Sequence, residues 1–155
     1  MEELANYRRS LIKQYQEIGT EIENIVERLA VEKRDPFQER TEWSAYQIFA
    51  HMRDVEVGYF LPFIKRVLVG EKTELGVFES VEKKGNDETG EEQLQEIISD
   101  LKDNHTLLTA MLVEMSLMDW NCTGRFQRSG MHTVQWYLEQ NLAHLKMHIN
   151  QLEGQ

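Results

Sequence analysis

Two histidines near the C-terminus have a spacing that suits metal binding. His144 and His148 are four residues apart, so a helix places them on one face with their Cβ atoms about 5–6 Å from each other. Tyr137 and Asn141 extend the same stripe toward the N-terminus. Because this stripe adjoins the apolar positions of the segment, we expect both imidazole rings to face the protein interior.

A third histidine, His51, belongs to a separate apolar pattern. It follows Ile48 by three residues and precedes Val55 by four, which places it on the inner face of another helix. Neutral imidazoles are good ligands for zinc, nickel, copper or iron, and three of them leave coordination positions open to water or substrate. Spacing alone leaves an alternative, in which these rings are ordinary core histidines.

Other polar residues carry weaker signals. His105 falls on an apolar stripe, where a core or bundle-end role is favoured over a further metal ligand, and His132 is interpreted as a loop residue before a helix. Cys122 lies in a connection with no base pattern near it, so its thiol is not expected to be a nucleophile.

Glu56, Glu139 and Asn141 are candidates for supporting a metal site or transferring protons. The alternative for the two glutamates is a solvated helix surface, and for Asn141 an internal polar contact. The sequence therefore assigns no general base.

Four amphipathic helices would have to position these side chains. Apolar residues recur with a helical period over about residues 3–32, 44–69, 89–115 and 133–152. Alternating strand patterns and Asn-Gly or Asp-Gly hairpin turns are nearly absent. Four long amphipathic segments predict an all-α protein, a four-helix bundle.

Capping and breaking residues mark the ends of these helices. Trp43 and Ile48 occupy the flanking positions of a hydrophobic staple, Pro62 is expected to kink the second helix, and Gly70 should end it. The predicted N-caps and their capping-box partners are Ser44 with Gln47, Thr89 with Glu92, and Thr133.

The predicted connections limit the topology. Residues 32–42, 71–90 and 116–132 form connections that exceed the roughly 2–8 residues usual between antiparallel helices of a bundle. At least one of them could therefore cross the bundle and leave two helices parallel. Periodicity does not choose between these arrangements.

Charge and composition exclude several classes of protein. The 155 residues are 41% hydrophobic and carry a formal net charge of −10, so no basic face suited to nucleic acid is expected. Residues 71–103 hold eleven acidic residues against four lysines, which is interpreted as a solvated surface. With a charged N-terminal segment, no long apolar run and one cysteine, we expect a cytoplasmic protein that does not enter membranes.

Three stretches resemble the DinB-like superfamily of metal-binding four-helix-bundle proteins. WSAYQIFAHMRDVE, residues Trp43–Glu56, is similar to the family's second helix. Asp119-Trp120 with Gly130–Thr133 is similar to the loop before its last helix, and Leu142–Leu152 to that helix's His-x-x-x-His ending. The chain departs from many relatives at Phe126, often polar or histidine, and at Leu145, often glutamate.

This resemblance implies one domain over residues 1–155, with up-down-down-up topology and a long crossover between helices 2 and 3. It also implies a divalent metal, zinc or nickel foremost, held by His51, His144 and His148. Relatives include transferases or isomerases that use a low-molecular-weight thiol, such as bacillithiol or mycothiol, and proteins resembling metal-dependent hydrolases.

The resemblance further implies a homodimer, with a small molecule as the partner if the protein is an enzyme. The alternative is a non-catalytic bundle in which the metal site is structural, sensory or vestigial.

Overall fold

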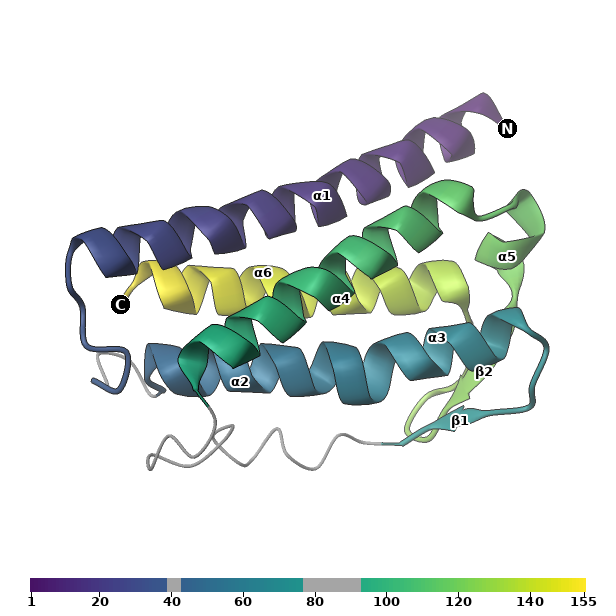
Figure 1. Ribbon diagram of the computed structural model, residues 1–155. Coiled ribbons are helices and arrows are strands. Elements are labelled where there is room, and N and C mark those ends of the chain that lie inside the picture. The colour runs from purple at the N-terminus through teal and green to yellow at the C-terminus, as the bar shows by residue number, and fades with distance from the viewer. Residues whose placement is uncertain (39–42, 77–92) are drawn as a thin grey trace.

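The computed structural model describes residues 1–38, 43–76 and 93–155, and its long helices are close to the predicted ones (Figure 1). A short helix, α5 (Leu117–Asn121), precedes the last long one. The long helical elements are α1 (Glu2–Val31), α2 (Ala45–Val55) continuing through the π-helix η1 (Glu56–Phe60) into α3 (Leu61–Leu68), α4 (Leu94–Glu114), and α6 (Val134–Glu153).

The helices form an up-down-down-up bundle, as predicted. In Figure 1, α1 and α6 run in one direction, whereas α2–α3 and α4 run in the other. Both α4 and α6 pack against α1 and against α2, so the consecutive helices α1 and α2 occupy opposite corners. Since α3 and α4 run in parallel, the end of α3 and the start of α4 lie at opposite ends of the bundle, as a long crossover between them requires.

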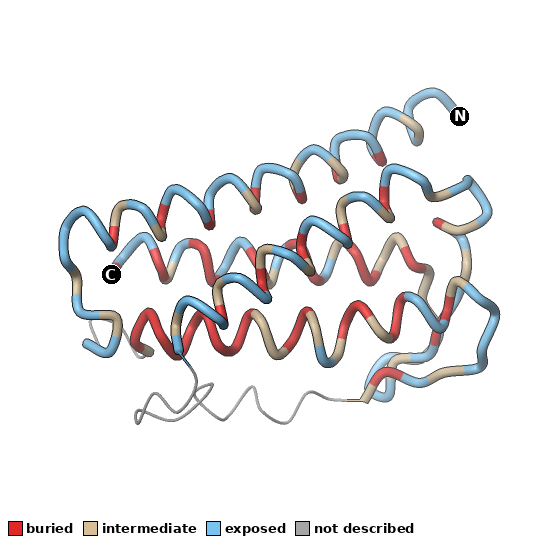
Figure 2. Tube along the Cα trace, viewed as in Figure 1, coloured by how far each residue is buried: buried red, intermediate tan, exposed pale blue. Residues whose placement is uncertain are grey.

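The core lies between the inner faces of these helices, where the buried positions gather (Figure 2). Tyr15, Ile22, Phe49, Phe63 and Leu108 are among its fully buried side chains, and each contributes about 1.5–3 kcal/mol through burial of apolar surface. In the described ranges, no helix has the length and apolar character needed to cross a membrane.

The predicted helix caps are confirmed where the structure describes them. The Ser44 hydroxyl accepts a hydrogen bond from the Gln47 backbone N–H at 3.2 Å, and the Gln47 side chain accepts one from the Ser44 N–H at 2.8 Å. The Thr133 hydroxyl caps α6. Thr89 and Glu92 lie outside the described residues, and the N-cap residue of α4 is Gln93. These caps fix where α2 and α6 begin, and therefore which of their faces point inward.

The second helix is irregular next to Pro62, the position at which the sequence predicted a kink. It widens into η1 before Pro62, which lies in the first turn of α3. Proline has no N–H to donate and its ring would clash with the carbonyl four residues earlier. A π turn relieves this conflict and changes which residues face inward.

A small sheet at one end of the bundle was not predicted, because the sequence analysis assigned its segments to connections. β1 (Glu74–Leu75) pairs in parallel with β2 (Thr123–Phe126), and β2 pairs antiparallel with β3 (Gly130–Thr133). The loop ends at Gly130, whose φ is +87°, as in hairpins with three-residue loops. These strands are too short to show an alternating pattern, and the Ser129–Gly130 turn was the available signal.

Gly124 allows the sheet to lie directly on α3. A Cβ atom at this position would approach Phe63 to 2.7 Å and Val67 to 2.8 Å, closer than carbon atoms can pack. The Gly124 carbonyl accepts a hydrogen bond from the Tyr137 hydroxyl at 2.9 Å. The sheet is thereby fixed to α3 and α6, next to the histidine face of α6.

Candidate metal centre

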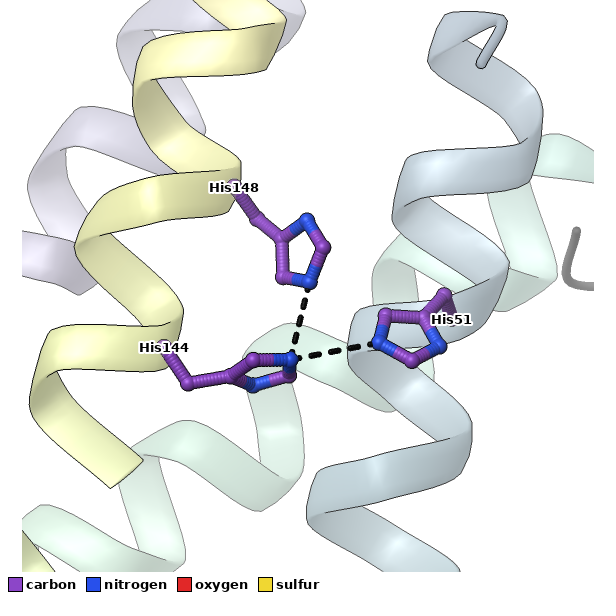
Figure 3. A group of neighbouring side chains, drawn as sticks. All are labelled: His51, His144 and His148. Carbon is purple, nitrogen blue, oxygen red and sulfur yellow. Dashed lines mark hydrogen bonds between the residues drawn. The ribbon is translucent and has the colours of Figure 1, made fainter. Parts of the chain in front are cut away.

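The three predicted histidines come together between α2 and α6. Figure 3 shows His144 and His148 pointing from α6 toward His51 on α2. The Nε2 atom of His144 lies 2.9 Å from that of His148 and 3.3 Å from that of His51. Each of the three rings offers one possible ligand atom, and these three atoms lie within 4.8 Å of one another.

Ordinary hydrogen bonding does not account well for this convergence. A neutral imidazole nitrogen offers either one N–H or one lone pair, yet His144 Nε2 faces two other ring nitrogens. Zinc–nitrogen bonds are about 2.0–2.1 Å long, so the ligand nitrogens of one ion stand roughly 3 Å apart. The spacing of the three Nε2 atoms therefore fits a divalent metal better than a hydrogen-bonded chain.

Burial and mutual proximity keep these rings neutral. Burial, followed by the charges of His148 and His144, lowers the pKa of His51 to about 3. Burial and His148 lower the pKa of His144 to about 4. Burial also lowers the pKa of His148, although the hydrogen bond that His148 donates to Gln151 acts in the opposite direction. The rings therefore present lone pairs at neutral pH, which is the form that binds metal.

Two side chains that the sequence analysis did not assign to the site hold its rings in place. The Gln151 side-chain oxygen accepts a hydrogen bond from His148 Nδ1 at 2.7 Å, so the lone pair of that ring stays on Nε2. Trp43 stacks with His148 and meets His51 edge-on, with ring centroids 6.0 Å and 5.0 Å away. Gln151 was identifiable in the sequence as the residue three positions after His148 on the same helix.

A pocket of about 280 Å³ adjoins the cluster. His144 is part of its wall and is therefore shared between the two. The remaining wall is largely aromatic, and the sequence analysis did not predict it because its residues come from separate elements. The principal lining side chains are Tyr59, Phe60, Phe126, Trp136, Tyr137 and His144.

His105 is not a fourth ligand but a core residue, which confirms the favoured interpretation. It is 3% exposed, with Nδ1 at 3.2 Å from Glu56 Oε1 and Nε2 at 2.5 Å from the Tyr15 carbonyl oxygen. Burial lowers the pKa of His105, but the hydrogen bond and charge of Glu56 and the Tyr15 carbonyl outweigh it and raise the pKa overall. Gly19 leaves room for the ring, since a Cβ there would meet His105 at 3.3 Å.

Glu56 is fully buried, so the interpretation of this residue as part of a solvated surface is wrong. It begins the π-helix η1, and its carboxylate pairs with His105 rather than with the metal cluster. A regular helical pattern does not predict this inward position, because the wider π turn changes which residues face the core.

The other candidates also lie outside the histidine cluster. Asn141 makes the internal contact considered for it, donating to the Tyr15 hydroxyl at 3.2 Å. Glu139 accepts a hydrogen bond from the Tyr7 hydroxyl. Cys122 is a free, half-buried thiol after α5. His132 belongs to β3 rather than to a loop, and its ring stacks on Trp136 at 3.7 Å between centroids.

The fold and the histidine cluster together define a helical-bundle protein with a candidate metal centre, and comparison with known proteins assigns its family. Residues 14–152 match the family model of the DinB superfamily, and the chain belongs to that family. A solved structure of YfiT from Bacillus subtilis shares the fold with a TM-score of 0.67 and 17% sequence identity. The match covers 94% of this chain and 83% of YfiT, which is described as a probable metal-dependent hydrolase with an unusual four-helix bundle topology. Among curated proteins, none matches the chain.

Proposed function

We propose that His51, His144 and His148 bind one divalent transition metal ion, with zinc or nickel as the first candidates. The observation that carries this proposal is the convergence of three neutral imidazole rings, each with one possible ligand nitrogen within 4.8 Å of the others. A bound ion would lower the pKa of a water or thiol and polarise an electrophilic group. Three protein ligands leave room for such a partner.

We further propose that the protein is a metal-dependent enzyme acting on a small molecule, with hydrolysis as the favoured reaction. The pocket beside His144 supports an enzyme, because a purely structural site has no need of an adjoining cavity. The fold shared with YfiT, described as a probable metal-dependent hydrolase, favours hydrolysis over thiol transfer. Transfer to a low-molecular-weight thiol is the competing outcome of the test below.

The chain's own residues would orient and shield the reaction. Gln151 holds the His148 ring by its Nδ1 atom. Trp43 stacks on His148 and meets His51 edge-on. His144 borders both the cluster and the pocket. These contacts restrain the rings in orientations that suit binding of one ion.

The first test is metal content by elemental analysis of untagged protein. We expect about one transition metal ion per chain in the wild type and almost none in His148→Ala, because two imidazoles bind far more weakly than three. His132→Ala is the matched control, since that ring lies outside the cluster, and it should retain the metal. Absence of metal, with no uptake of added zinc or nickel, would overturn the metal proposal.

The second test separates the reactions. The metal-loaded wild type is assayed against a panel of esters and amides, with and without an added thiol such as bacillithiol or mycothiol. Turnover in water alone, lost in His148→Ala, supports hydrolysis. Turnover that requires the thiol supports transfer instead, and a metal-loaded protein inert in both assays would favour the non-catalytic bundle. The homodimer, the cytoplasmic location and the single domain over residues 1–155 stay predictions.

A further inference from the structure

The pocket beside His144 has an unusually uniform wall. Its aromatic rings come from η1, from β2 and from α6, so three separate elements converge to line it. Leu75 and Val55 add apolar surface, and the described lining residues include no aspartate, glutamate, lysine or arginine. A charged group entering this wall would lose hydration without gaining an ionic partner.

Two polar groups in the wall, on Tyr137 and Asn141, are hydrogen-bonded within the protein. The Tyr137 hydroxyl donates to the Gly124 carbonyl at 2.9 Å, and the Asn141 amide donates to the Tyr15 hydroxyl at 3.2 Å. Burial, assisted by Tyr59, raises the pKa of Tyr137 to about 12, so this phenol stays neutral. The wall therefore favours apolar contact over ionic recognition.

The pocket and the histidine cluster share one face of α6. Tyr137, Asn141 and His144 line the pocket, and His148 follows one turn later in the cluster. A group seated against Tyr137 and Asn141 therefore has the cluster at its His144 end. The pocket volume of about 280 Å³ is nearly twice that of a roughly 150 Å³ apolar cavity that binds benzene.

We propose that this pocket binds an uncharged apolar group of the substrate, of about the size of a bicyclic aromatic ring, and presents the adjoining polar bond to the histidine cluster. The inference rests on the proposed function, since the metal supplies the chemistry. It adds the substrate class: a neutral aromatic or similarly bulky hydrocarbon group attached to the reacting bond. Phe126, which belongs to the β2–β3 hairpin, is the wall residue whose substitution tests the preference of the pocket for uncharged groups.

Equilibrium dialysis with naphthalene, and with naphthalene-2-sulfonate as the charged analogue of the same ring, tests the proposal. Wild-type protein should bind naphthalene at least about tenfold more tightly than the sulfonate, because the wall offers no partner for the charge. Phe126→Asp should weaken naphthalene binding by about tenfold or more, since it places a carboxylate against the ring. Phe126→Leu, which keeps the wall apolar, should cause a smaller loss.

Met131→Asp is the matched control, because Met131 lies on the neighbouring strand, is 57% exposed and does not line this pocket. Its affinity for naphthalene should equal that of the wild type. Circular dichroism and metal content establish that each variant is folded. If Phe126→Asp does not fold, the proposal is tested by the binding of both ligands to the wild type and by the affinity of Phe126→Leu for naphthalene.

The results separate this inference from the proposed function. Equal binding of both ligands, or an affinity for naphthalene that Phe126 substitutions leave unchanged, would overturn the pocket assignment even in a protein that holds metal. Naphthalene binding that depends on Phe126, in a chain that takes up no metal, would support the pocket and overturn the metal site.

Discussion

The bundle buries histidines in two places, and their surroundings favour opposite charge states. In the cluster of His51, His144 and His148, each ring nitrogen that faces the centre meets another imidazole, and the pKa of every ring is lowered. His105 instead has an acceptor at each ring nitrogen, the Glu56 carboxylate and the Tyr15 carbonyl, and its pKa is raised.

The difference shows that partners, more than depth, decide what a buried histidine can do. A ring with two acceptors is stabilised as the imidazolium, which has no lone pair for a metal. Protonation of rings that face one another is unfavourable because it brings like charges together, so these rings stay neutral and keep their lone pairs. The His105–Glu56 pair therefore connects α1, η1 and α4, whereas the three-histidine cluster is suited to binding an ion.

The largest expected effect comes from breaking the His105–Glu56 pair. Glu56→Leu or His105→Leu should each lower the free energy of unfolding by about 3–5 kcal/mol, because the remaining partner stays buried without its counter-charge. Urea unfolding followed by circular dichroism measures the loss. Metal content of the folded fraction should stay at the wild-type level, since neither residue belongs to the cluster.

The double variant Glu56→Leu/His105→Leu sharpens this prediction. With both polar partners gone, it should be more stable than either single variant, since no unpaired charge remains. Additive losses in the double variant would show that the two residues are not coupled, and would contradict an ion pair.

An intermediate effect is expected from Gln151 in the other region. Gln151→Leu removes the acceptor for His148 Nδ1, so the ring can turn or change tautomer, and zinc affinity should fall by about 10–100-fold. Competition with a chelating dye measures the affinity. Asn150→Leu, at an exposed position on the same helix, is the control; an equal loss in both variants would exclude a specific role for Gln151.

The smallest expected effect is a difference in the pH dependence of stability, measured as Tm of metal-free protein at about pH 5 and about pH 8. The pKa of His51 lies near 3 when folded against an ordinary 6.5. Between the two values, His51 is protonated in the unfolded chain but not in the folded chain. This ring therefore lowers the free energy of unfolding as the pH falls below about 6.5. The Tm of His51→Phe minus the Tm of the wild type should therefore be more positive at about pH 5 than at about pH 8.

His105→Phe should show the reverse. Because the folded pKa of His105 is raised, its stabilising contribution is complete below the ordinary value and is lost as pH rises through the raised one. This variant should lose more Tm relative to the wild type at about pH 5 than at about pH 8. Parallel pH profiles for the two variants would contradict the opposite charge states.

The sequence was sufficient for the helices and for the inward faces of the three histidines, because a four-residue spacing and an apolar stripe each have direct geometric meaning. That the three rings form one site was implied by the family resemblance. It was insufficient for Glu56, whose inward position follows from the π turn. The pocket could not be predicted either. Phe126 comes close to Tyr59 only when β2 packs against α3, and β2 is too short to show a strand pattern in the sequence. Local periodicity thus predicted the elements, and long-range packing determined the wall around the site.

The position of the cluster also has a consequence for the way the chain unfolds. His51 and His144 are 93 positions apart in the sequence, so an ion bound by both would close a loop containing more than half of the protein. Such a cross-link restricts the unfolded chain in the manner of a long-range disulfide, for which chain-entropy models give about 4–5 kcal/mol. Unlike a disulfide, it opens when a chelator removes the ion, so the unfolding rate of the loaded protein should be governed by metal release.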